Sequence, residues 1–309
     1  MGSIRIAIAG FTGRVAQSIT ANLLQRSNIE VVGICRDLKK IPEAVAKHPR
    51  VKTWKADYSD LTAIESALHG VSSCICCYRG SADVVTTGQR TLIDACVSQR
   101  VKRYFASDFS FDYRSLKTGE FPFKDFQLEI DAYLAKKEKE SGLKAVHILN
   151  GGFIEAILTT FMGVLDVEAK KIRYWGTGDE PWDMTSTDDT ARFTAEVACD
   201  ESVSGVLKVR GDSKSIKEMA RVLETQYGVR FTFENLGSLD ELRKTMTLAR
   251  KETPDEPWKW LGMHYNYFTI DGSTLLGVPD NEKYPNLKVD DLATFCKRYS
   301  LEELPTLFN

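Results

Sequence analysis

Histidine is scarce in this sequence, and it has neither long hydrophobic runs nor an excess of one charge. Four histidines stand apart, at positions 48, 69, 147 and 264, so their spacing predicts no metal site. Lys and Arg number 41 against 43 Asp and Glu, a balance that argues against a nucleic-acid surface. No apolar stretch is long enough for a signal peptide or a membrane span, so we expect a cytoplasmic protein without a membrane partner.

The seven cysteines are odd in number, and most of them lie inside apolar stretches. This pattern is typical of reduced, buried thiols in a reducing compartment. Three cysteines, at 74, 76 and 77, share one expected strand, where neighbouring side chains point to opposite faces. They therefore do not form a zinc site.

Short β-branched runs alternate with helical stretches over residues 3–150. Strands are expected near 4–9, 30–35, 51–55, 72–77, 102–106 and 144–149, and helices near 14–25, 41–47, 61–69, 82–98 and 124–141. Several of these strands are almost continuously apolar, which indicates burial on both faces. The pattern predicts an α/β protein with a doubly wound, Rossmann-type parallel sheet.

The rhythm changes after about Asn150 to longer helices separated by Gly, Pro and aromatic loops. We expect a strand near 205–209 to return to the first sheet. The predicted domains are therefore a Rossmann domain over 1–150 with a returning segment 186–210, and a smaller, discontinuous α+β substrate-side domain over 151–185 and 211–309.

A glycine turn stands between the first expected strand and the first helix. Gly10 allows the chain to turn, Gly13 allows a pyrophosphate to approach, and Ala16 allows the helix to pack on the strand. Phosphates would meet the amide groups at the positive end of that helix. The predicted cofactor contacts are Gly10, Phe11, Thr12, Gly13, Arg14 and Val15.

The end of the second strand carries Arg36 and then Asp37. An arginine here favours the 2′-phosphate of NADP(H), and Arg14 would supply a second guanidinium. The alternative is that both arginines are solvated surface charges and Asp37 selects NAD. Asp57, after the third strand, would either contact the adenine or cap the helix near Leu61.

Further motifs resemble the NmrA-like group of atypical short-chain dehydrogenases, which includes isoflavone reductase. The resemblance is carried by Gly10-Phe-Thr-Gly13, Val101-Lys-Arg-Tyr-Phe-Ala-Ser107-Asp108-Phe109, Leu149-Asn150-Gly151-Gly152-Phe153, Tyr174-Trp-Gly176-Thr-Gly178-Asp179 and Asp188-Asp189-Thr190-Ala191. The last two look particularly like fungal members. The resemblance implies an NADP-type Rossmann domain, a small substrate domain, and a lysine near the start of the helix after the fifth strand that acts as a proton relay.

Gln127 stands at that lysine position when Phe126–Ile130 is matched to the helix start. An amide cannot relay a proton near neutral pH, so this departure bears directly on catalysis. Lys124, one helical turn earlier, either replaces the lysine or is an ordinary surface residue.

A Tyr-x-x-x-Lys pair, Tyr133 and Lys137, offers a competing catalytic motif. Lys137, however, would lie ~20 Å along the helix from its start, away from the ligand-binding edge of the sheet. Tyr133 also shares the apolar stripe of that helix, which favours core packing over catalysis. Ser107 and Tyr113, the second in a loop over 111–123 that is either a lid or a surface loop, complete the catalytic candidates.

The remaining candidates follow strand ends. They are either cofactor contacts or residues that cover the cleft: Tyr78, Arg79, Ser107, Asp108, Asn150, Gly151 and Phe153. An aromatic stretch over 258–268 either lines an aromatic substrate pocket or belongs to the core.

Three functions fit these residues. The leading hypothesis is an NADPH-dependent oxidoreductase that reduces a small aromatic or enone-like metabolite by hydride transfer in specialised metabolism, with the proton from water, Lys124, Tyr113 or Tyr133. The second is a non-catalytic NADP(H) sensor that conveys redox state to a protein partner, as regulatory members of the family do. The third is a redox-neutral isomerase or lyase on the same fold.

Overall fold

The computed structural model describes residues 3–308, whose contacts divide into two compact units. The first unit holds the chain up to Phe109, Lys117–Leu149 and Thr190–Leu207. The second unit holds Ser110–Leu116, Asn150–Asp189 and the chain from Lys208 onward. The sequence predicted that residues 110–116 belong to the first domain. Their contacts place them in the second unit instead.

A seven-stranded sheet forms the centre of the first unit, in the order β11-β6-β5-β4-β1-β2-β3. Its strands are β1 (Ile4–Ala9), β2 (Ile29–Cys35), β3 (Val51–Lys55), β4 (Ser73–Cys76), β5 (Arg103–Phe105), β6 (Lys144–Leu149) and β11 (Gly205–Lys208). Pairs from β3 through β6 are parallel. The doubly wound parallel sheet predicted from the sequence is confirmed, including the late return of β11.

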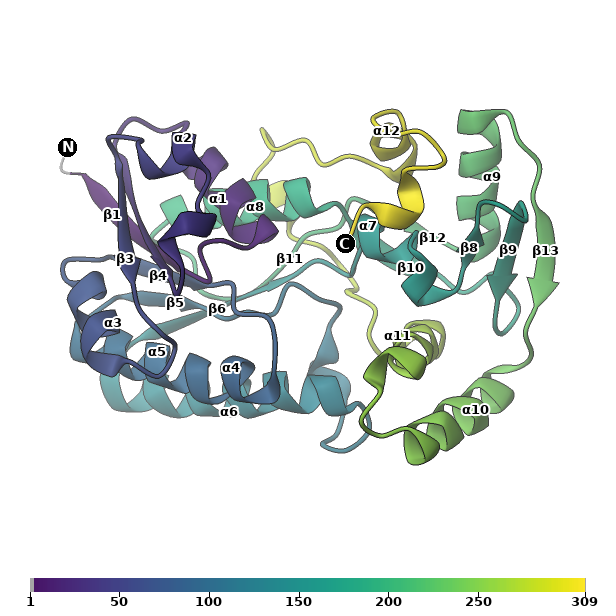
Figure 1. The fold of residues 1–309 in the computed structure, drawn as a ribbon, viewed down its shortest axis with the longest axis horizontal. Helices are drawn as coiled ribbons and strands as arrows, with labels where there is room; N and C mark the ends of the chain where they lie inside the picture. The colour runs from purple at the N-terminus through teal and green to yellow at the C-terminus, as the bar shows by residue number, and fades with distance from the viewer. Residues whose placement is uncertain (1–2, 309) are drawn as a thin grey trace. The chain divides into compact units, whose positions relative to one another are not determined.

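Helices cover both faces of this sheet, with α1 and α8 on one side and α3, α5 and α6 on the other (Figure 1). The helices of this unit are α1 (Arg14–Leu23), α2 (Glu43–Ala46), α3 (Leu61–Leu68), α4 (Ala82–Val85), α5 (Thr87–Ser98), α6 (Pro122–Ser141) and most of α8 (Thr187–Cys199). The single helix expected over 82–98 is broken at Thr86, whose φ and ψ of -107° and -75° leave the helical range. Apolar side chains of α3, α5 and α6 pack with those of the sheet in a buried core.

The strand order reverses between β1 and β4. Strands β2 and β3 are added on one side of β1, and β4, β5 and β6 are then added on its other side. In an open parallel sheet, ligands bind at this switch point, beside the carboxyl ends of the strands. The glycine turn directly after β1 therefore lies where a ligand is expected.

The second unit is built on two three-stranded sheets, β12-β10-β7 and β13-β9-β8. Its strands are β7 (Gly152–Phe153), β8 (Leu165–Asp166), β9 (Lys171–Tyr174), β10 (Trp182–Thr185), β12 (Asp212–Lys214) and β13 (Thr232–Asn235), and its helices are α7 (Ile154–Ile157), α9 (Ile216–Tyr227), α10 (Leu239–Glu252), α11 (Leu261–Ile270) and α12 (Leu292–Cys296). Both sheets and these helices contribute to a separate buried core. The unit is α+β, as predicted.

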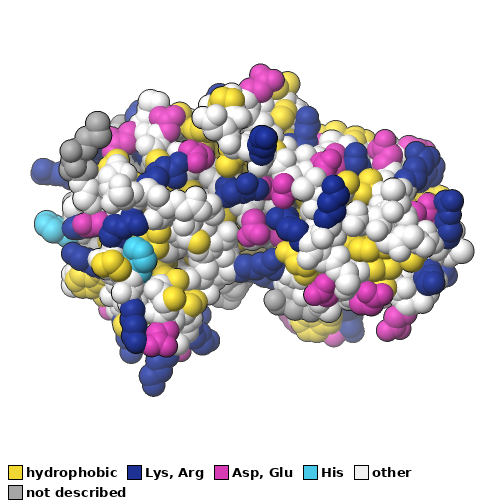
Figure 2. Space-filling view, turned by 90° about the horizontal axis from the view of Figure 1, so that it is seen from above, with side chains coloured by type: hydrophobic (Ala, Val, Ile, Leu, Met, Phe, Trp, Pro, Cys, Tyr) yellow, Lys and Arg dark blue, Asp and Glu magenta, His cyan; other side chains and the backbone are white. Residues whose placement is uncertain are grey.

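Charges of both signs are interspersed over the face shown in Figure 2, without a large area of one sign. This arrangement agrees with the near-neutral net charge of -2. Among residues 3–308, no helix combines the length and the apolar character needed to cross a bilayer.

Candidate active site

The glycine turn leads from β1 into the N-terminus of α1. Gly10 adopts a φ of 77°, a conformation that side chains with a Cβ disfavour, and both Gly10 and Phe11 donate backbone hydrogen bonds to the Ile34 carbonyl. Gly13 is the N-cap of α1, and no side chain caps this helix. The N-terminus of α1, with its glycine N-cap, is the kind of helix end that binds phosphate.

Phe11 has a packing role that the sequence did not reveal. Its ring is fully buried and covers Gly33, where a Cβ would lie 2.3 Å from the ring. The backbone of Phe11 remains part of the turn, because its carbonyl accepts from the Gln17 amide. Thr12 and Val15 are both half-buried. Any cofactor contact of Phe11 is therefore limited to its backbone.

Arg14 and Arg36 are both exposed in the first unit. Asp37 turns its carboxylate to its own chain, accepting from the Lys39 amide at 3.0 Å. In an NAD-selective site, a carboxylate at the end of β2 would instead accept hydrogen bonds from the ribose hydroxyls. The arrangement favours the interpretation of Arg36 as a ligand for a 2′-phosphate.

Asp57 closes a tight turn rather than capping α3. Its carboxylate accepts from the Ser59 hydroxyl at 2.8 Å and the Ser59 amide at 3.1 Å, which lower the pKa of Asp57. Asp60 caps α3 instead, accepting from the Ala63 amide at 3.0 Å. The capping alternative for Asp57 is therefore wrong, whereas its contact with adenine stays a prediction.

Ser107 connects two loops at the carboxyl edge of the sheet. Its hydroxyl donates to the Tyr78 carbonyl at 2.8 Å, and its amide donates to Gln89 at 3.1 Å. Burial raises the pKa of Tyr78, so its phenol is a poor acid near neutral pH. Arg79, the next residue, is exposed. Ser107 thus links the loop after β5 to the loop after β4.

A polar stripe runs along α6, formed by Lys124, Gln127 and Asp131. Their spacing of three and four residues places them on one side of the helix. Lys124 is only 4% exposed, and burial lowers the pKa of its amine from 10.5 to about 7, although the nearby Asp108 carboxylate opposes the shift. The alternative of a surface lysine is wrong.

Gln127, at the position of the expected family lysine, contacts the same region. Its amide nitrogen donates to the backbone carbonyl of Asp108 at 3.0 Å. Its side-chain oxygen is buried and has no hydrogen-bond partner among the described residues. Gln127 therefore holds the backbone at Asp108, and its side-chain oxygen could still accept a hydrogen bond.

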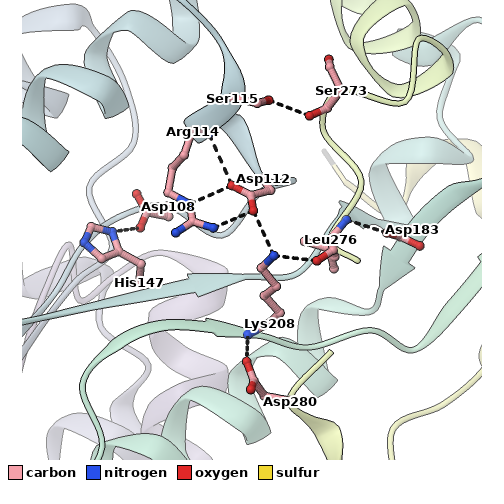
Figure 3. A network of polar contacts seen from close by, with 10 residues as sticks. All are labelled: Asp108, Asp112, Arg114, Ser115, His147, Asp183, Lys208, Ser273, Leu276 and Asp280. Carbon is pink, nitrogen blue, oxygen red and sulfur yellow. Dashed lines mark hydrogen bonds and ion pairs between the residues drawn. The ribbon is translucent and has the colours of Figure 1, made fainter. Parts of the chain in front are cut away.

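His147 of β6 faces the stripe and joins two carboxylates, the first of which is drawn in Figure 3. Its Nδ1 lies 2.7 Å from Oδ2 of Asp108, and its Nε2 lies 3.4 Å from Oδ1 of Asp131. Phe109, directly after Asp108, has a φ of 36°, a strained conformation for a bulky side chain. The scattered histidines show no metal-ligand spacing, so His147 was not among the site residues predicted from the sequence. A histidine inside an apolar strand was the available signal.

Tyr133 and Lys137 turn to a different side of α6. The Tyr133 hydroxyl donates to Asp94 of α5 at 2.7 Å, and the Lys137 amine lies 2.7 Å from the same carboxylate. The Tyr133 ring packs against the buried core. Tyr133 lies two residues from Asp131, which rotates it by about 200° around the helix. The packing interpretation of Tyr133 agrees with this geometry.

In the second unit, Tyr113 belongs to an anchored segment. Asp112 is bound by its amide to the Thr274 carbonyl at 3.2 Å and by its carboxylate to Lys208 at 3.1 Å, while Ser115 donates to Ser273 (Figure 3). Tyr113 itself is fully buried. Residues 110–116 therefore do not form the mobile part of a lid, and Tyr113 presents no exposed phenol.

Asn150, directly after β6, has a fully buried side chain in the second unit. Neither its amide nitrogen nor its oxygen has a hydrogen-bond partner among the described residues. Because buried polar groups are nearly always paired, Asn150 is a candidate for contact with a ligand. Gly151 next to it has a φ of 68°, and a Cβ there would lie 2.2 Å from the Asp183 carbonyl. That approach to protein backbone explains the glycine without a ligand.

Phe153 and the aromatic stretch also lie in the second unit. The Phe153 ring is half-buried against Phe308, with 5.8 Å between centroids. Trp260 and Phe268 are buried in the unit, whereas Trp258 is 66% exposed and borders a cavity of about 210 Å³ with Phe161 and Trp175. The stretch thus divides between core and cavity wall. No group of His, Cys, Asp or Glu within residues 3–308 is arranged to hold a metal.

Solved structures of similar fold cover nearly the whole chain. An isoflavone reductase structure matches with a TM-score of 0.76 and 18% identity, covering 96% of this chain and 99% of that one. The protein AtPrR2, solved with NADP+ and (+)pinoresinol, matches with a TM-score of 0.80 and 16% identity over 96% of this chain and 99% of its own. These likenesses show the fold.

Two relatives match in sequence. An NmrA-like family domain-containing oxidoreductase of Gibberella moniliformis is 29% identical over 165 residues, which are 52% of this chain and 54% of that protein. The alignment thus spans about half the length of that relative. Quinone oxidoreductase 2 of Escherichia coli is 26% identical over 241 residues, which are 76% of this chain and 79% of the relative.

The family model described as the NmrA-like family matches residues 3–295, nearly all of the chain. The resemblance predicted from the sequence motifs is thereby confirmed. With the Rossmann-type sheet, the uncapped turn at Gly10 and relatives named as oxidoreductases, this match leads to one conclusion: the chain belongs to the NmrA-like family.

Proposed function

We propose that this protein is an NADP(H)-dependent oxidoreductase that reduces a small aromatic or enone-like molecule. The observation that carries the proposal is the turn at Gly10. It leads directly into the N-terminus of α1, and its backbone leaves no room for a side chain at Gly10. Arg14 and Arg36 add positive charge in the same unit. These residues fit the diphosphate and the 2′-phosphate of NADP(H).

The relatives support the same cofactor and substrate class. The Escherichia coli NADPH-dependent quinone oxidoreductase, solved with NADPH, shares the fold with a TM-score of 0.71 and 22% identity over 98% of this chain. AtPrR2 is solved with NADP+ and an aromatic molecule, (+)pinoresinol. Conjugated carbonyl or aromatic substrates are therefore our first choice for this chain.

NADPH, when bound, supplies the hydride of the reduction. The chain's part is to bind, to orient and to supply a proton. The backbone from Gly10 to Val15 binds the diphosphate, and the linked loops at Tyr78 and Ser107 help to orient the cofactor. Lys124 donates the proton, because an amine with a pKa of about 7 is populated in both forms near neutral pH.

Binding measurements test the cofactor part of the proposal. Calorimetry should show that Arg14→Ala and Arg36→Ala each weaken NADPH binding roughly ten- to a hundredfold, since a charged hydrogen bond contributes roughly 1.5–3 kcal/mol. The affinity for NADH should stay unchanged in both variants. Arg230→Ala, at a side chain that is 91% exposed in the second unit, is the matched control. Failure of NADPH to bind the folded protein would overturn the proposal.

Turnover measurements test the reaction. NADPH consumption should accelerate with some members of a panel of quinones and enones, and Lys124→Met should slow it. A nucleotide sensor is the second candidate function, because the Gln127 amide replaces the expected lysine and cannot transfer a proton. Tight NADPH binding without turnover on any panel member would favour the sensor.

A further inference from the structure

The proposed proton donor leaves two contacts of a buried histidine unexplained. The His147 ring is held between the carboxylates of Asp108 and Asp131 inside the first unit, although neither His147 nor Asp131 belongs to the turn at Gly10. The side chains of His147 and Asp108 are 6% and 3% exposed, whereas that of Asp131 is 39% exposed. Burial of two ionisable groups together is expensive and needs a reason.

The geometry of the ring gives that reason. Both ring nitrogens face a carboxylate oxygen, at 2.7 Å and 3.4 Å. A neutral imidazole donates from one nitrogen only, whereas the protonated ring donates from both. The ring thus holds the buried Asp108 carboxylate through Nδ1, while its Nε2 faces the partly exposed Asp131.

Asp108 is in turn the carboxylate that acts on Lys124. Burial of an ammonium group is tolerable only beside a fixed opposite charge. Gln127 holds the backbone of Asp108, and His147 holds its carboxylate. Cys76 of β4 is a further titratable group near Asp108, and burial raises the pKa of its thiol to about 12, so it stays neutral.

From this arrangement we propose that His147 is the positioning residue of the proton donor: anchored by Asp131, its ring holds the Asp108 carboxylate as the counter-ion of the Lys124 ammonium. The inference rests on the proposed function, in which Lys124 supplies the proton. Without His147, the Asp108 carboxylate loses the contact that holds it in place. The ammonium form of Lys124 then loses the fixed position of its counter-ion.

A titration of the lysine amines by NMR tests the coupling in the resting protein, without substrate or cofactor. The Lys124 signal is identified by its loss in Lys124→Met. We expect Lys124 to titrate near pH 7 in the wild type and at least one pH unit lower in His147→Leu. His147→Asn, whose amide nitrogen can replace Nδ1 as a donor to Asp108, should restore most of the wild-type value.

Two further variants keep the result interpretable. Asp131→Asn, at a partly exposed side chain, should shift the titration in the same direction by a smaller amount and reports even if His147→Leu fails to fold. His264→Leu removes another buried histidine, in the second unit, and should leave Lys124 unchanged. An unaltered Lys124 titration in folded His147→Leu or in Asp131→Asn would overturn the inference.

The pH profile of turnover provides the second measurement. Because the acid must be protonated, kcat should fall as the pH rises through the Lys124 pKa, and this fall should move to lower pH in His147→Leu with NADPH affinity unchanged. If the Lys124 pKa drops by one, kcat at a pH above both values should drop about tenfold. A uniform loss at every pH would mean a merely structural role. An absence of any turnover would contradict the proposed function, whereas the NMR result would still decide the coupling.

Discussion

Gly10 and Cys77 are in contact through their backbones, at the ends of two adjacent strands. A Cβ on Gly10 would lie 2.6 Å from the Cys77 carbonyl oxygen, and the Cys77 amide donates to the Ala9 carbonyl at 2.8 Å. The turn that we assign to the diphosphate is therefore shaped by β4 as well as by β1. Its glycine is required both for its positive φ and for this approach.

Gly10→Ala should lower stability and prevent NADPH binding, because the methyl group displaces the turn from Cys77. Gly142→Ala is the matched control, since Gly142 has the same φ of 77° but nothing within 4 Å of an added Cβ. The control should lose only the ~1–2 kcal/mol of a left-handed residue and bind NADPH normally. Urea unfolding and calorimetry measure both effects. Equal losses in the two variants would show that the contact with Cys77 is unimportant.

Lys124 should make stability depend on pH with a defined sign. Its pKa is about 7 in the folded protein against 10.5 as the ordinary value, so the unfolded chain binds more protons between these limits. The cost of burial is therefore complete below pH 7 and disappears as the pH rises toward 10.5. Stability should gain up to ~1.4 kcal/mol per pH unit over this range relative to Lys124→Met.

Urea unfolding of both proteins at pH 7, 8 and 9 measures this difference, and Lys124→Met should be the more stable protein at pH 7. Parallel pH curves for the two proteins would contradict the lowered pKa of Lys124.

Tyr133→Phe should leave turnover within about twofold of the wild type. Its hydroxyl contacts Asp94 rather than the stripe of Lys124 and Asp131, so its loss costs one hydrogen bond, ~1 kcal/mol of stability. Tyr133→Leu, which also removes the packed ring, should destabilise the protein more without changing kcat. A hundredfold drop of kcat in well-folded Tyr133→Phe would show that Tyr133 of the Tyr-x-x-x-Lys pair is catalytic.

Asn150→Leu should stabilise the protein without ligand and weaken its binding of NADPH or substrate about tenfold. The amide of Asn150 is buried without a partner among the described residues, a state that costs ~1–3 kcal/mol and is relieved when a ligand pairs with it. Asn266→Leu is the control, because the Asn266 amide donates to Met162 and Gly262 and its loss should destabilise. Thermal unfolding with and without NADPH distinguishes the two. A destabilised Asn150→Leu would show that its amide is paired within the protein.

The sequence located the elements of the first unit closely. Strands over 4–9, 51–55 and 144–149 were predicted with the bounds that the structure has, because alternation and apolar runs act between neighbouring residues. The turn at Gly10 was predictable for the same reason. The capping of α3 by Asp60 was missed although an Asp directly before a helix is a sequence signal for an N-cap, whereas the break at Thr86 interrupts a segment whose periodicity continues.

By itself, the sequence determined the strand-turn-helix that begins the fold, the order of the βαβ units and the membership of the family. Only the tertiary structure decided that Lys124 is buried, that Tyr133 turns to Asp94, and that His147 joins Asp108 to Asp131. The physical reason is distance along the chain. Periodicity fixes what each segment becomes, but the charge and burial of a side chain depend on residues that folding brings from other strands and helices.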